Sequence, residues 1–268
     1  MPTIEPIFQH GIVLMLVAFR LAGVLLFSPI VASAGIPTRA KAFLVITLAA
    51  AVFPTIEPSW HASADMTLAN IAPIMVTETL IGASVGFIAS IPIVAMQLGG
   101  TIMGMQMGLG LAQIYDPMNG ENSGVVDQLM FYLAAAVFLM LGGLDIMFMA
   151  LIGTYESVPL GSMAMHAAPV ELITGILSSG YELAMRVSAP VVAIMLLETV
   201  ASGVLMKTIP QINILTIGFA IKIMAGLFGL IGALMAIEVV FTDELRSVMS
   251  QLTQWTGVPS SAAGVFGG

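Results

Sequence analysis

Long apolar segments separated by short polar connections dominate the pattern of this chain. A helix that crosses a membrane needs about 20 mostly apolar residues, because the hydrocarbon layer is about 30 Å thick. The segments that suit this criterion are 11–33, 42–56, 71–96, 128–153, 172–204 and 212–240. The pattern therefore predicts an all-α membrane protein with about six long apolar helices or hairpins. We expect them to form a single integral membrane domain over residues 1–268.

Composition strengthens this prediction and excludes several classes of function. Hydrophobic residues make up 59% of the chain and charged residues only 8%, against roughly a quarter charged in a soluble domain. The chain has no cysteine and no Lys/Arg run, which argues against thiol chemistry and against nucleic-acid binding. His10, His61 and His166 are far apart and lack metal-ligand spacing. We therefore expect no catalytic residue, no cofactor and no metal site.

One enzyme-like pattern needs an explanation. Residues 82–86 fit G-x-S-x-G with Ser84 at its centre, and in hydrolases this pattern sits on a sharp strand-to-helix turn. Here it lies inside an apolar helical segment, and no base for Ser84 can be identified. We favour a small-residue packing face formed by Gly82 and Gly86 over an intramembrane hydrolase.

Charged residues within or beside the apolar segments are a second candidate feature. An isolated charge in an apolar environment is costly, so each must face water, protein or an opposite charge. Two interpretations stay open: pairing between helices or subunits, which the equal number of acids and bases favours, and an ion or proton pathway. The residues are Arg20, Glu78, Arg186, Glu198, Lys222 and Glu238.

The segment 97–115 is rich in glycine and methionine. Gly100, Gly104, Gly108 and Ala112 recur every fourth residue, so a helix here would present one smooth face of the kind that lets membrane helices pack closely. The alternative is a re-entrant or irregular segment beside a conduit, since non-helical backbone at membrane depth requires protein or water around it. The polar segment 116–127 follows and is typical of an exposed turn.

Residues 205–222 carry the most recognisable motif. Pro210 would stop the preceding helix, and Gln211 and Asn213 could satisfy backbone groups at the start of the next one, which also carries Lys222. This stretch resembles the signature of the FliR family, the flagellar export-gate proteins, whose injectisome counterparts belong to the same superfamily. Matching residues elsewhere are Arg20, Ser28, Pro29, Ile36, Pro37, Arg39, Glu78, Gly82, Gly99, Gln106, Gly108, Asp116, Pro117, Pro159 and Gly161. One departure is Leu144-Asp145, where relatives often carry a histidine.

The resemblance implies partners and a location that composition could not supply. Proteins of this family assemble with FliP and FliQ proteins into a helical export gate at the flagellar base, in the bacterial inner membrane. FlhB and FlhA lie nearby, and unfolded flagellar subunits pass through the gate. The family fold implies a FliP-like part, about residues 1–170, joined to a FliQ-like helical hairpin and tail, about residues 171–268. Use in a flagellum or in an injectisome stays open, with the motifs favouring the flagellum.

The resemblance also implies a plug-like loop at residues 104–124. Methionines can conform to a passing chain and glycines allow bending, so we expect passive gating of a conduit for unfolded subunits. The candidate gate residues are Met103, Gly104, Met105, Met107, Gly108, Gly110, Tyr115, Asp116 and Pro117. The alternative function is an ion-coupled secondary transporter, which would need an internal repeat around a midplane site, and no convincing repeat is visible.

Overall fold

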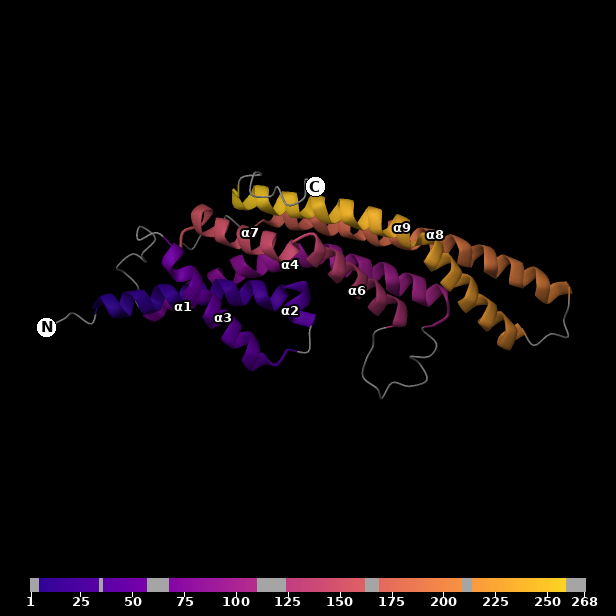
Figure 1. Ribbon diagram of the computed structural model, residues 1–268, viewed down its shortest axis with the longest axis horizontal. Helices are drawn as coiled ribbons and strands as arrows, with labels where there is room; N and C mark the ends of the chain where they lie inside the picture. Colours follow the sequence, from indigo (N-terminus) through magenta and orange to yellow (C-terminus); the bar gives the residue numbers. More distant parts are fainter. Residues whose placement is uncertain are drawn as a thin grey trace. The chain divides into compact units, whose positions relative to one another are not determined.

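The computed structural model describes residues 5–33, 36–56, 68–109, 124–161, 169–208 and 214–258. Every secondary-structure element in these ranges is a helix (Figure 1). Five of the described helices are long and apolar enough to cross a membrane, or up to six if one bent pair forms a single span. The prediction of an all-α membrane protein is confirmed.

Helix α1 (Glu5–Phe27) packs against α3 (Thr38–Val52). The short α2 (Pro29–Ser33) and the 3-10 turn η1 (Phe53–Thr55) flank α3. The ring of His10 on α1 lies 6.0 Å from the ring of Phe53. Ala49 is the buried residue of α3, so most of the apolar surface of this helix faces away from the rest of the described chain.

Helix α4 (Leu68–Gln106) is longer than the predicted span 71–96. It runs without interruption through residues 97–106, so this part of the glycine-rich segment is helical and not irregular. A Cβ added at Gly100 would lie 2.6 Å from the Cα atom of Asp127, and one at Gly104 would lie 3.7 Å from Cβ of Val126. The packing interpretation is therefore confirmed for these two glycines.

The predicted span 128–153 is broken in the structure. It consists of α6 (Val125–Met140) and α7 (Gly143–Ser157), which meet at an angle of 65°. The break has a local cause: Gly142 has a φ of +69°, a conformation that L-residues with side chains disfavour. Gly143 lies against the ring of Phe138, whose Cε2 atom would be 2.5 Å from an added Cβ. A helix that continued straight from α6 into α7 would not need glycine at position 142 or 143.

Helices α8 (Val170–Thr208) and α9 (Ile214–Thr256) contain 39 and 43 residues. At about 1.5 Å per residue each is about 60 Å long, twice the hydrocarbon thickness. The prediction ended the last span at residue 240, whereas α9 continues to Thr256. Its final turns are amphipathic, because Phe241, Leu245 and Val248 are buried at helical spacing, and a criterion based on overall apolarity misses such turns.

The described chain divides into two compact units, each assembled from segments that are distant in sequence. One unit comprises Met1–Ile91, Phe138–Ile176 and Arg246–Gly268. The other comprises Pro92–Val137 and Leu177–Leu245. The division into a part over 1–170 and a part over 171–268 stays a prediction.

Candidate functional site

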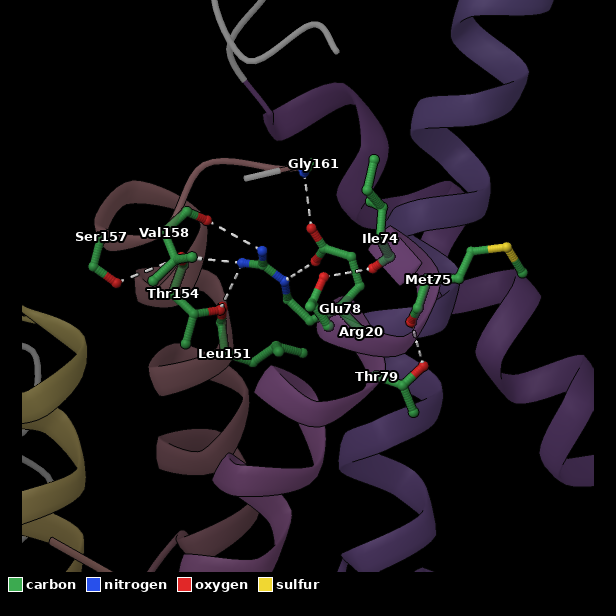
Figure 2. Close-up of polar contacts among 11 residues, drawn as sticks. Arg20, Ile74, Met75, Glu78, Thr79, Leu151, Thr154, Ser157, Val158 and Gly161 are labelled. Atoms are coloured by element: carbon green, nitrogen blue, oxygen red, sulfur yellow. Dashed lines mark hydrogen bonds and ion pairs between the residues drawn. The ribbon is translucent and has the colours of Figure 1, made fainter. Parts of the chain in front are cut away.

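A buried ion pair lies within the first unit. Nε of Arg20 on α1 donates to Oε2 of Glu78 on α4 at 2.6 Å, and both side chains are 0% exposed (Figure 2). Charges this deeply buried require paired and hydrogen-bonded surroundings. The structure therefore brings together two of the six charged residues singled out by the sequence.

The rest of the Arg20 guanidinium binds the end of α7. Nη1 donates to the carbonyl oxygen and to Oγ1 of Thr154, at 3.0 and 3.1 Å, and Nη2 donates to the carbonyl oxygen of Val158 at 3.1 Å. The last carbonyl groups of a helix have no partner inside the helix and carry partial negative charge, so a cation there is favourable. Arg20 thus serves as a C-terminal cap for α7 that is supplied from a different helix.

Glu78 has a second partner on the other side of the carboxylate. Its Oε1 atom accepts a hydrogen bond from the backbone N–H of Gly161 at 2.9 Å (Figure 2). Gly161 has a φ of +79° and lies in the turn after α7. The ion pair therefore joins α1, α4 and the turn after α7 at one point.

Two glycines let α1 and α4 come close enough for this pairing. A Cβ at Gly82 would lie 1.8 Å from the backbone oxygen of Arg20, and one at Gly23 would lie 2.2 Å from that of Thr79. Both positions therefore require glycine. Ser84, in the same stretch of α4, donates its hydroxyl to the carbonyl oxygen of Leu80 at 2.9 Å. The packing interpretation of this G-x-S-x-G pattern is confirmed, because the pattern lies within a continuous helix.

The cluster holds α1, α4 and the end of α7 together through buried charges that are paired and hydrogen-bonded. Its carboxylate and guanidinium are fully buried and bind to one another and to fixed backbone groups. The Cζ atom of Arg20 also lies 4.5 Å from the centre of the Tyr155 ring. Sequence reasoning missed Thr154, Tyr155 and Val158, because two of the interactions with Arg20 use main-chain oxygens that leave no signal in the side chains.

The other charged candidates lie on more open surfaces. Arg186 forms an ion pair with Glu182 one turn away, and these side chains are 61% and 62% exposed. Glu198 is half-buried and accepts a hydrogen bond from Ser202 at 2.6 Å. Among the described residues, neither Lys222 nor Glu238 forms an ion pair. The structure therefore does not join Arg186 to Glu198 or Glu238.

The end of α4, in the second unit, contains the described part of the candidate gate. Met103 and Met107 are 0% exposed, whereas Met105 is 68% exposed. Helical geometry explains the difference, because 103 and 107 are four residues apart on one face and 105 points away from them. Of these three methionines, Met105 alone is accessible on the described chain.

Gly108 ends α4 with a well-defined backbone motif. Its φ is +80°, its N–H donates to the carbonyl oxygen of Met105 at 3.1 Å, and the N–H of Leu109 donates to that of Gly104 at 3.1 Å. These two bonds form a Schellman motif, in which the residue of positive φ is usually glycine. Gly110, Tyr115, Asp116 and Pro117 lie outside the described residues, as do Pro210, Gln211 and Asn213.

A family model described as bacterial export proteins, family 1, matches residues 12–248. The match covers most of the chain, from the first turns of α1 into the last part of α9. The chain belongs to this family.

Relatives of this bacterial export protein are similar over three quarters or more of their length. The flagellar biosynthetic protein FliR of Escherichia coli is 26% identical, over 87% of this chain and 88% of the relative. FliR of Bacillus subtilis is 25% identical, over 88% of this chain and 90% of the relative. The surface presentation of antigens protein SpaR of Salmonella typhimurium is 28% identical, over 76% and 75%. The resemblance to FliR that the motifs indicated is confirmed.

Several residues that carried the resemblance lie together in this export protein. Arg20, Glu78 and Gly161, which are far apart in sequence, meet in the buried cluster. Lys222 is half-buried on α9. Asp145, where the sequence departs from the family pattern, is exposed in the first turn of α7. The cluster therefore gives Arg20, Glu78 and Gly161 a shared structural role.

Proposed function

We propose that this chain is a structural and gating component of a type III protein export apparatus at the flagellar base, in the bacterial inner membrane. The observation that carries the proposal is the family match over residues 12–248. The similarity to FliR proteins over nearly 90% of both chains supports flagellar use. Because the chain is also similar to SpaR, the alternative is that it works in an export apparatus other than the flagellar one.

The exposed apolar surface supports a role inside an assembly. On α8 and α9, Leu197, Val200 and Met235 are 71%, 67% and 83% exposed. Apolar patches of this kind mark contact with lipid or with other subunits. Because helices about 60 Å long exceed the hydrocarbon layer, part of this surface needs protein around it. FliP and FliQ proteins are the partners we propose, with FlhB and FlhA nearby.

The gating role is assigned to residues 104–124. Met105 presents a soft, exposed side chain at the end of α4, and thioethers adapt to varied partners. The Schellman motif at Gly108 ends the helix before the polar segment that follows. In this proposal the segment narrows the conduit at rest and yields to an unfolded chain.

The part over 1–170 would be FliP-like and the part over 171–268 FliQ-like.

Co-purification and leakage test the two parts of the proposal. A tagged copy, expressed with FliP and FliQ and extracted in mild detergent, should emerge in one large stoichiometric complex. Replacing residues 111–121 by a Gly/Ser segment of equal length should leave this complex intact but increase leakage of ions and small solutes into cells. A chain that purifies alone and takes up a small solute would favour a secondary transporter. An intact complex with unchanged leakage would contradict the gate.

A further inference from the structure

Helix α3 exposes apolar side chains over a wide part of its surface. Phe43, Leu44 and Ile46 are 74%, 40% and 62% exposed. At 3.6 residues per turn, these three positions together span about 160° of the helix circumference. Ala49 is the buried residue of this helix, so the described chain covers only a narrow side of α3.

The polar side chains in the apolar part of α3 and η1 are satisfied within the same segment. Oγ1 of Thr47 donates to the carbonyl oxygen of Phe43 at 2.8 Å, and Oγ1 of Thr55 donates to that of Val52 at 2.7 Å. Residues 42–56 include no charged residue. Hydrocarbon offers no hydrogen-bond partner, so a segment in contact with lipid must satisfy its polar groups internally. This segment meets that requirement.

The length and the ends of this segment fit a single crossing of a bilayer. Thr38–Thr55 contains 18 residues, which gives about 27 Å, close to the hydrocarbon thickness of about 30 Å. Arg39 and Lys41 lie at one end, and Glu57 follows the other. Neither basic residue forms an ion pair with a described residue. Their charges complement the negative headgroups of anionic phospholipids.

The long helices α8 and α9 differ from α3 in the charge of their exposed surfaces. On α8, the side chains of Glu182 and Arg186 are 62% and 61% exposed, and Glu238 is exposed on α9. Charges within the hydrocarbon layer are costly, so these surfaces are poorly suited to lipid over their whole length. The exposed surface of α3 between Lys41 and Glu57 has no such charge.

We propose that the lipid bilayer itself covers the exposed surface of α3. Acyl chains contact the side chains around Ile46, and anionic headgroups lie at Arg39 and Lys41. The inference goes beyond the export function, because it assigns the part of this chain that meets lipid and does not depend on what the assembly transports.

Site-directed spin labelling tests which medium surrounds α3, since the chain has no cysteine of its own. A nitroxide is attached at Ala40→Cys, Ile46→Cys or Thr55→Cys, three positions that are exposed on the described chain. The chain is purified with cysteine-free partner subunits and reconstituted into vesicles of phosphatidylethanolamine and phosphatidylglycerol. Collisions with oxygen, which concentrates in hydrocarbon, are compared with collisions with a water-soluble nickel chelate. We expect the oxygen-to-nickel ratio to be severalfold higher at position 46 than at positions 40 and 55.

Ala49→Cys provides the reference for a position that protein covers, because Ala49 is 1% exposed. Few collisions with either reagent at position 46, as at position 49, would show that another subunit covers α3 and would overturn the proposal. Frequent collisions with the nickel chelate at position 46 would show contact with water and would also overturn it.

Substitutions distinguish lipid from a subunit in a second way. Acyl chains adapt to a changed apolar surface, whereas truncating an aromatic residue in a packed subunit interface weakens assembly. Phe43→Ala should therefore leave the amount of assembled complex in membranes unchanged. Phe241→Ala is the matched control and should lower it, because Phe241 is fully buried. Ile46→Lys should also lower it, since it places a charge in the middle of the hydrocarbon layer.

Loss of the complex in Phe43→Ala, or a normal level in Ile46→Lys, would contradict contact with lipid. The outcome for the proposed function is separate. A chain whose label at position 46 is exposed to lipid but which does not assemble with FliP and FliQ would refute the export proposal and leave this inference intact.

Discussion

The carboxylate of Glu78 and the backbone N–H of Gly161 are 83 positions apart in sequence and 2.9 Å apart in the structure. The other oxygen of the carboxylate binds Arg20. A single side chain therefore links α4 both to α1 and to the turn after α7. The Glu78 carboxylate thus holds α1, α4 and the turn after α7 together, and an apolar side chain at this position could not make either interaction.

Replacing one member of the buried pair should be more harmful than replacing both. Glu78→Met or Arg20→Met leaves an uncompensated buried charge, which costs about 3–5 kcal/mol. The double variant removes both charges, so it should lose less stability than the sum of the single variants. Thermal unfolding of the purified complex in detergent measures the three effects.

The exposed pair of α8 is the control for this experiment. Arg186→Met breaks an ion pair whose side chains are about 60% exposed, and such surface pairs contribute about 0–1 kcal/mol. A loss of stability at Arg186 as large as that at Arg20 would show that burial does not explain the difference.

Gly82→Ala should prevent α1 and α4 from reaching their observed separation. The new Cβ would lie 1.8 Å from the backbone oxygen of Arg20, and a backbone atom cannot move aside as a flexible side chain can. Inserting atoms into a packed core costs about 1–3 kcal/mol or more, so the amount of folded protein in membranes should fall. Gly11→Ala on α1 meets no atom within 4 Å and should leave the level unchanged or raise it.

The sequence was sufficient to predict the helical membrane class and the family, because both depend on features with strong local signals. Apolar segments of about 20 residues identify helices, and the order of residues such as Pro210 and Gln211 identifies the relatives. The interpretation of Gly82 and Gly86 as a packing face followed from the same apolar context.

The geometry of the buried cluster was harder to predict from the sequence. The charges of Arg20 and Glu78 within apolar segments predicted that each needs a partner, but not which one. Periodicity says nothing about contacts with Gly161 or with the carbonyl oxygens of α7, because those depend on how distant helices pack. The break at Gly142 was missed because hydropathy is high on both sides of it, although two successive glycines were a usable signal.

The bend between α6 and α7 should depend on the conformation of Gly142. Its φ of +69° costs about 1–2 kcal/mol for an ordinary L-residue. We therefore expect Gly142→Ala to lower the free energy of unfolding by this amount, and Gly142→Asn to lower it less, since asparagine tolerates the left-handed region better. Equal losses in the two variants would indicate that space, and not φ, limits the position.

The aromatic ring of Tyr155 should stabilise Arg20 independently of the ion pair. The Cζ atom of Arg20 lies 4.5 Å from the ring centre, within the range of a cation–π interaction, which contributes about 2 kcal/mol when desolvated. Tyr155→Phe retains a ring at this position and Tyr155→Leu does not, so the leucine variant should unfold at the lower temperature. The same comparison in an Arg20→Met background isolates the interaction, because a neutral side chain has no charge to attract. If the difference between Phe and Leu persists unchanged without Arg20, ring packing alone explains the contribution of Tyr155, and the cation–π assignment is wrong.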